Sequence, residues 1–128
     1  MKKKILIVVA NYYENIASSL LKSAKNKIKN KCNIDVIRVP GTFEIPVTIA
    51  KNLKKYNGFI ALGCVIKGQT PHFDFISSAA TNAIMDLSIN FKKPIGNGIL
   101  TCLSMKQAKA RKRKGAEAAN AVISVLSQ

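Results

Sequence analysis

The sequence predicts an α/β fold in which a parallel sheet is covered by helices on both faces. Strand-length apolar runs alternate with helical patterns along the whole chain, which is the order of elements that a parallel sheet requires. Two of these runs, residues 5–10 and 59–65, are almost continuously apolar, as in strands that are buried on both faces. The length of 128 residues and the hydrophobic content of 48% suit one domain, residues 1–128, with a substantial core.

The first strand, residues 5–10, is followed by a pattern typical of an amphipathic helix over residues 15–31. Apolar residues recur there every four positions between lysines: Ile16, Leu20, Ala24 and Ile28. Residues 34–39 alternate in character and predict a second strand. Pro40 and Gly41 end that strand, because proline cannot donate to the hydrogen-bond ladder.

The middle of the chain predicts two helices around the third strand, residues 59–65. Residues 44–55 form the first helix, and Pro46 is tolerated in its opening turn because an amide hydrogen there lacks a helical partner. Residues 73–91, rich in alanine and serine, form the second and longer helix.

The last quarter of the chain predicts a fourth strand and two more helices. Residues 94–100 form the strand, and Ser104 is placed to cap a short helix that begins near Met105. Residues 115–126 form a final apolar helix. In a fold of this kind ligands bind beyond the carboxyl ends of the strands, so the loops at those ends are the segments to search.

The net charge of +15, from 21 basic and six acidic residues, is compatible with two interpretations. A surplus of this size is found in nucleic-acid-binding proteins. A lysine-rich solvated surface explains it as well, since the only arginines are Arg38, Arg111 and Arg113. Because arginine performs much of specific base recognition, its scarcity disfavours nucleic acid as a partner.

The cysteines, Cys32, Cys64 and Cys102, are odd in number and far apart, and the chain has a single histidine. This argues against a disulfide framework and against an ordinary zinc site. Cys64 lies in an apolar run and is expected to be a buried core residue rather than a nucleophile. The apolar run near the amino end is too short for a signal peptide, and no segment approaches membrane-spanning length. We therefore expect a cytoplasmic protein without a metal or a membrane partner. The sequence also lacks a Walker A motif and a dinucleotide-binding fingerprint, so we expect no cofactor.

Residues suited to chemistry lie where the strands are expected to end. The sole histidine, His72, follows the third strand, and the nearby Gly68 and Thr70 offer a backbone amide and a hydroxyl that suit a phosphate. The imidazole of His72 can transfer protons near neutral pH, and Asp74 is close enough in sequence to orient it. The alternative is a histidine that caps a helix or satisfies a turn.

The segments after the first two strands carry further candidates. Thr42 and Glu44 can bind ligand hydroxyls, or they can serve as the cap and the first-turn acid of the following helix. Tyr12 can stack on a flat heterocycle, or it can be a surface aromatic that covers the sheet edge. The residues alone do not decide between these interpretations.

Five blocks in series resemble the 6,7-dimethyl-8-ribityllumazine synthase family along nearly the whole chain. They are PGTFEIP at 40–46, ALGCVIKGQTPHFD at 61–74, GILT at 98–101, QAKAR at 107–111 and KGAEAA at 114–119. One block alone has little weight, but five in the right order on the predicted fold are specific. The resemblance implies a flavodoxin-like three-layer sandwich with a four-stranded parallel sheet, assembled into a homopentamer with active sites between subunits.

The resemblance also implies a transferase of riboflavin biosynthesis. Such an enzyme condenses 5-amino-6-(ribitylamino)uracil with 3,4-dihydroxy-2-butanone 4-phosphate to give 6,7-dimethyl-8-ribityllumazine, and phosphate and water leave. By the same resemblance His72 is the catalytic proton-transfer residue, and Arg111 from a neighbouring subunit binds phosphate near Lys114. The other implied substrate-binding residues are Tyr12, Thr42, Phe43, Glu44, Cys64, Val65, Ile66, Gln69, Thr70 and Asn97.

The chain departs from the family pattern in the segment that carries the implied phosphate-binding arginine. Only Lys112 and Arg113 separate Arg111 from Lys114, where the family has several more residues. The sequence therefore leaves open whether Arg111, Arg113 or Lys112 binds the phosphate. A relative that binds a flavin or a lumazine without making it is an alternative function that would fit this short segment.

Other departures concern the pocket wall and the assembly. Asn97 stands where many members carry an aromatic residue, and Tyr12 and Tyr13 replace the commoner Phe-Asn pair. The chain begins almost directly at its first strand, which together with the short loop favours a free pentamer over a sixty-subunit shell. A basic nucleic-acid-binding α/β protein remains the alternative from another functional class, and it would bind DNA or RNA with a steep dependence on salt.

Overall fold

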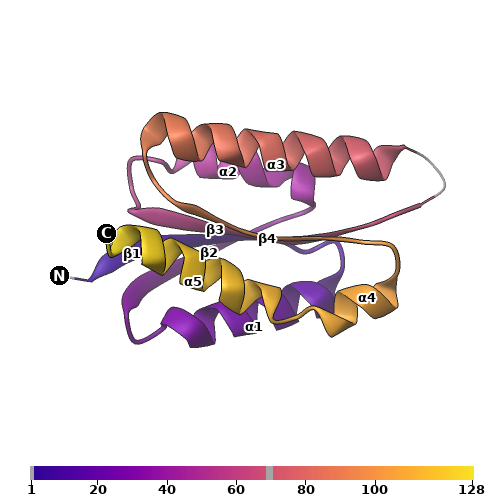
Figure 1. Cartoon of the computed structure of the whole chain (residues 1–128), viewed down its shortest axis with the longest axis horizontal. Coiled ribbons are helices and arrows are strands. Elements are labelled where there is room, and N and C mark those ends of the chain that lie inside the picture. Colours follow the sequence, from indigo (N-terminus) through magenta and orange to yellow (C-terminus); the bar gives the residue numbers. More distant parts are fainter. Residues whose placement is uncertain (1, 69–70) are drawn as a thin grey trace.

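The structure, a computed structural model that describes residues 2–68 and 71–128, contains one sheet of four parallel strands in the order β2-β1-β3-β4. The strands are β1 (Lys3–Ala10), β2 (Cys32–Val39), β3 (Gly58–Ile66) and β4 (Ile95–Cys102). The helices are α1 (Glu14–Ile28), the 3-10 turn η1 (Thr42–Glu44), α2 (Ile45–Lys51), α3 (His72–Phe91), α4 (Met105–Ala110) and α5 (Lys114–Leu126). Figure 1 shows α2 and α3 on one face of the sheet and α1, α4 and α5 on the other. This arrangement confirms the predicted flavodoxin-like sandwich.

The two central strands are buried over most of their length. Residues 5–9 of β1 and 59–62 of β3 have no exposed surface. Because β1 pairs with both β2 and β3, and β3 with both β1 and β4, their peptide groups find hydrogen-bond partners within the sheet. The continuous apolar runs in the sequence reflect this burial on both faces.

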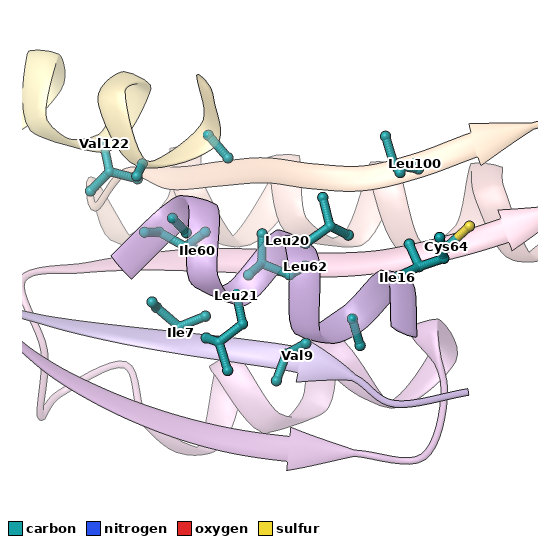
Figure 2. Close-up of a cluster of buried hydrophobic side chains, with 14 of the residues drawn as sticks. Ile7, Val9, Ile16, Leu20, Leu21, Ile60, Leu62, Cys64, Leu100 and Val122 are labelled. Atoms are coloured by element: carbon teal, nitrogen blue, oxygen red, sulfur yellow. The ribbon is translucent and has the colours of Figure 1, made fainter. Parts of the chain in front are cut away.

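Successive side chains of β1 point to opposite faces, so the sheet separates two apolar cores. Figure 2 shows the core beneath α1 and α5, where Ile7 of β1 lies in one cluster with Leu20 of α1 and Val122 of α5. The other core joins β1 to α2 and α3 through a second set of side chains: Leu6, Val8, Ile45, Ile49, Ala80 and Ile84. Both faces of β1 are therefore covered by helices.

Two helices end earlier than the sequence pattern predicts. α1 stops three residues and α2 four residues before the expected ends at residues 31 and 55. In each case a local hydrogen bond tightens the chain, from the Lys31 amide to the Ile28 carbonyl at 2.9 Å and from the Asn52 side chain to the Thr48 carbonyl at 2.7 Å. Such helix ends depend on single polar contacts, so the periodicity of apolar residues does not predict where they lie.

The predicted cap of α4 is confirmed. The Ser104 hydroxyl accepts the Gln107 amide at 3.2 Å, and the Gln107 side chain accepts the Leu103 amide at 2.8 Å. β4 begins at Ile95 rather than at Pro94, whose carbonyl nevertheless accepts the Phe59 amide at 3.0 Å. No helix within the described residues is both long and apolar enough to cross a membrane.

Helices α1 and α5 approach backbone to backbone at Gly115. A Cβ atom added at Gly115 would lie 2.2 Å from the carbonyl oxygen of Leu20 and 3.2 Å from the amide nitrogen of Ala24. The neighbouring Ala116 amide donates to the Ser23 hydroxyl at 2.9 Å, which fixes how the two helices are aligned. A side chain at Gly115 would therefore have to push the helices apart.

We expect Gly115→Ala to lower the free energy of unfolding by roughly 1–3 kcal/mol, the usual cost of overpacking a core. Gly68→Ala is the matched control, because a Cβ atom there meets no atom within 4 Å among the described residues other than its chain neighbours. The control should stay within about 0.5 kcal/mol of the parent protein. Urea unfolding followed by circular dichroism measures both variants, and a Gly115→Ala protein as stable as the control would contradict the predicted contact.

Candidate active site

The carboxyl ends of β1, β2 and β3 border a cavity of about 720 Å³, at the edge of the sheet predicted from the strand order. This volume is in the range of small-molecule sites. In Figure 1 the start of α3 lies at this end of the sheet, and both chain termini lie at the other. The cavity is lined by Tyr12, Tyr13, Gly41, Thr42, Phe43, Glu44, Cys64, Val65, Ile66, Gly68, His72, Phe73 and Ile76.

The cavity brings together most of the residues that the sequence implied for one site. They come from four segments: Tyr12, Thr42, Phe43, Glu44, Cys64, Val65, Ile66 and His72. Gln69 and Thr70, expected at the same site, lie outside the described residues. Sequence reasoning missed Phe73 and Ile76 of α3, which also line the cavity. Their spacing of three residues could have indicated that both lie on one face of the helix that begins at His72.

The contact between η1 and β3 fixes one wall of the cavity. Thr42 is only 6% exposed, and a Cβ atom at Gly63 of β3 would lie 2.8 Å from the Thr42 hydroxyl oxygen. Glycine at position 63 thus allows η1 to sit directly against the sheet. This packing sets the height of Phe43 and Glu44 above the strand ends.

The expectation that Thr42 could cap the following helix is wrong. Gly41 is the residue that precedes η1, and Thr42 makes no capping hydrogen bond but packs inside the turn. Glu44 does act locally, because its carboxylate accepts the Gly41 amide at 3.0 Å. Only one of its two oxygens is used in this contact, which leaves the other as an acceptor for a ligand hydroxyl.

Aromatic side chains stand at the rim of the cavity. Tyr12 is 75% exposed and Phe43 is 61% exposed, and they come from the loops after β1 and β2. The Tyr12 ring meets Tyr13 edge to face, with ring centroids 4.9 Å apart and an interplanar angle of 82°. Exposed ring faces beside a cavity offer stacking surfaces for a planar heterocycle.

Burial raises the pKa of Tyr13, and the nearby Tyr12 and Cys64 groups raise it further. The raised pKa keeps the Tyr13 hydroxyl protonated well above neutral pH, so it remains a hydrogen-bond donor. Burial also raises the pKa of the Cys64 thiol to about 11, and Cys102 adds to the effect. Cys64 thus contributes a small apolar surface to the cavity, as the sequence predicted, and has little thiolate with which to attack a substrate.

A second cavity, of about 560 Å³, lies along the edge strand β4, beside the turn that joins α4 to α5. It is lined by Asn97, Ile99, Leu100, Thr101, Ala110, Arg111, Arg113, Lys114 and Glu117. Three of the implied substrate-binding residues, Asn97, Arg111 and Lys114, therefore lie here. Among the described residues, no lining residue is common to this cavity and the first.

The short connection between α4 and α5 is a regular turn. The Arg111 amide donates to the Ala108 carbonyl at 3.1 Å, and the Lys114 amide donates to the Arg111 carbonyl at 3.0 Å. Arg111, Arg113 and Lys114 line the cavity beside β4, whereas Lys112 does not.

Comparison with known proteins identifies the family of this chain. The family model described as 6,7-dimethyl-8-ribityllumazine synthase matches residues 2–128. The chain belongs to this family. The resemblance drawn from the five sequence blocks is confirmed.

Curated members of the family match at similar levels over nearly their whole length. The 6,7-dimethyl-8-ribityllumazine synthase of Agrobacterium fabrum is 43% identical over 138 residues, which cover 98% of this chain and 93% of the relative. The protein of the same name from Bartonella tribocorum is 42% identical over 138 residues, with 99% and 91% covered. The Bartonella henselae protein, also of this name, is 43% identical over 136 residues, with 98% and 88% covered.

We expect Cys64 to react slowly with iodoacetamide in the folded protein at pH 8. With the pKa raised to about 11, only about one thiol in a thousand is ionised at that pH, against about a quarter of ordinary thiols. The rate should rise as the pH approaches 11. Mass spectrometry of the Cys64 peptide measures the labelling, with the urea-unfolded chain as the control, and equal rates in the folded and unfolded protein at pH 8 would refute the prediction.

Proposed function

We propose that this protein is the lumazine synthase of a riboflavin pathway, an enzyme of the transferase class. It condenses 5-amino-6-(ribitylamino)uracil with 3,4-dihydroxy-2-butanone 4-phosphate, and it releases 6,7-dimethyl-8-ribityllumazine, phosphate and water. The observation that carries this function is the 43% identity to a protein of that name over 98% of the chain. The chemistry of the two cavities fits both substrates.

The first cavity suits the pyrimidine substrate. The exposed rings of Tyr12 and Phe43 and the apolar side chains of Val65 and Ile66 suit a planar ring, and the free oxygen of Glu44 suits a ribityl hydroxyl. The second cavity suits the butanone phosphate, because Arg111 and Lys114 supply positive charge there. Holding the two substrates together in reactive geometry provides much of the rate acceleration in such a reaction.

His72 is the proton-transfer group of the proposed mechanism. The 5-amino group of the pyrimidine adds to the ketone carbonyl of the butanone, and water leaves to give a Schiff base. Loss of a proton from the neighbouring carbon then expels the phosphate and leaves an enol, which takes up a proton to become a ketone. The ribitylamino nitrogen adds to this ketone, and loss of a second water closes the second ring. These steps each move a proton, and the imidazole at the start of α3 lines the cavity where they occur.

The proposed active site needs two chains. Within one chain the cavity that contains His72 and the cavity that contains Arg111 are lined by different described residues. A neighbouring subunit that places its β4 edge over the first cavity would complete the site. The apolar side chains of α3 exposed in the single chain support subunit contacts, since monomers seldom expose so many: Phe75, Met85, Ile89 and Phe91. We propose a homopentamer.

We further propose a cytoplasmic location. Cys32, Cys64 and Cys102 are all free and buried, which fits a reducing compartment.

A steady-state assay with both substrates tests the function. Lumazine formation is followed by its absorbance, with EDTA present and no cofactor added, and we expect turnover under these conditions. If the folded oligomer bound a lumazine but formed none, it would be a binding protein rather than an enzyme.

We expect His72→Ala to lower the turnover number by roughly tenfold to a hundredfold while binding of the pyrimidine persists, since proton transfer by a side chain contributes at or above this scale and the positioning of the substrates survives. His72→Asn is a second variant, which keeps a polar side chain but cannot take up a proton from the substrate. Initial rates at saturating concentrations of both substrates measure the effect. A rate equal to that of the parent protein in either variant would remove His72 from the mechanism.

We expect the protein in solution to have the mass of five chains of 13.9 kDa each. Multi-angle light scattering after size-exclusion chromatography measures this mass directly. Particles with the mass of sixty chains would instead mean that the pentamers assemble into a shell, and a stable monomer would contradict the shared active site.

A further inference from the structure

The turn between α4 and α5 presents two arginine side chains to one cavity. Arg111 and Arg113 both line the cavity beside β4, while Lys112, between them in sequence, does not. All three side chains are exposed in the single chain, so exposure alone does not separate them. The lining of the cavity does, because it includes Ala110, Arg111, Arg113 and Lys114 but not Lys112.

The backbone of this turn is tied to both helices. The Arg111 carbonyl accepts the Lys114 amide at 3.0 Å, and the Arg113 carbonyl accepts the Glu117 amide at 3.1 Å. The two side chains therefore start from fixed points two residues apart. Because the backbone of the turn is already ordered, a ligand that contacts both side chains loses little binding free energy to ordering the backbone.

The charges in the cavity suit a dianion. Three cationic side chains, those of Arg111, Arg113 and Lys114, face one carboxylate, that of Glu117, so two positive charges are in excess. Arg38 donates to Asn11 elsewhere, but within the described residues the side chains of Arg111 and Arg113 make no hydrogen bond or ion pair. A phosphate monoester carries about 1.5 to 2 negative charges at neutral pH and would relieve the repulsion between them.

Strand β4 adds neutral donors to the lining of the cavity. The Asn97 side-chain oxygen accepts the Ile99 amide at 3.0 Å, which orients the side-chain amino group as a donor. Thr101, also in the lining, has an exposed side chain with a hydroxyl. Donors on β4 and guanidinium groups on the turn can thus approach a tetrahedral anion from two sides.

We propose that Arg113 is a second phosphate-binding residue, which acts together with Arg111 on the phosphate of the butanone substrate and on the inorganic phosphate that is released. The identity of that substrate rests on the proposed function. Each guanidinium offers a planar pair of N–H donors, and two of them can hold a phosphate in one orientation better than a single lysine charge. Inorganic phosphate should then compete with the butanone phosphate.

The test compares Arg113→Ala with Lys112→Ala in the full-length oligomer. Both variants remove one exposed positive charge from the same turn, but only Arg113 lines the cavity. We expect Arg113→Ala to raise the KM for the butanone phosphate and the inhibition constant of inorganic phosphate by roughly tenfold or more, as for loss of a charged hydrogen bond. Lys112→Ala should change both by less than about twofold. The KM for the pyrimidine should stay unchanged in each variant, and Arg113→Lys should recover part of the loss.

Phosphate binding is also measured without turnover, from the 31P linewidth of inorganic phosphate titrated with each variant. If the parent protein bound phosphate through Arg113 but made no lumazine, the proposed reaction would be refuted, whereas the proposed role of Arg113 in phosphate binding would be supported. If it made lumazine and Arg113→Ala matched Lys112→Ala in both measurements, only the role of Arg113 would be overturned. Equal and large effects of both variants would also overturn it, because the general charge of the turn would then explain binding.

Discussion

The burial of β1 and β3 in the middle of a parallel sheet is the constraint on which the rest of this structure depends. Neither strand reaches water along residues 5–9 and 59–62, so their peptide groups must be paired with neighbouring strands and both faces must be covered by helices. Parallel pairing in turn requires each strand to be followed by a crossover. The loops that begin those crossovers gather at one edge of the sheet, and the larger cavity lies there.

Two glycines, Gly63 and Gly115, let neighbouring elements pack closely and so position the segments that line the two cavities. At Gly63 the absence of a side chain lets η1 rest on β3, so that Thr42 is buried and Phe43 and Glu44 face the cavity. At Gly115 the same absence lets α5 lie directly on α1. The start of α5 is thereby fixed, and with it the turn that carries Arg111 and Arg113. The positions of both groups of polar residues thus follow from helix and strand contacts in the core.

The polar residues are divided between two cavities, and for this reason the proposed function requires two subunits to associate. Tyr12, Phe43 and Glu44 line the cavity at the ends of β1, β2 and β3, and the cations line the cavity along the edge strand β4. Neither group alone suits both a planar pyrimidine and a phosphorylated ketone. A neighbouring chain that joins the two cavities would bring unlike binding surfaces together without burying the positive charges in either subunit.

The sequence by itself determined the strands, the order of elements and the edge of the sheet at which His72, Thr42 and Glu44 meet. These features follow from local periodicity and from the general rule that parallel strands present their carboxyl ends together. The family also followed from the sequence, because its blocks are continuous along the chain.

Only the tertiary structure decided which side chains face a cavity. It placed Thr42 inside η1 rather than at a helix cap, added Phe73 and Ile76 to the lining, and separated Arg113 from Lys112. The orientation of a turn or a helix depends on contacts between segments far apart in sequence, such as Gly115 of α5 against Leu20 of α1. Such contacts leave no periodic pattern in the chain, so no local pattern could have predicted them.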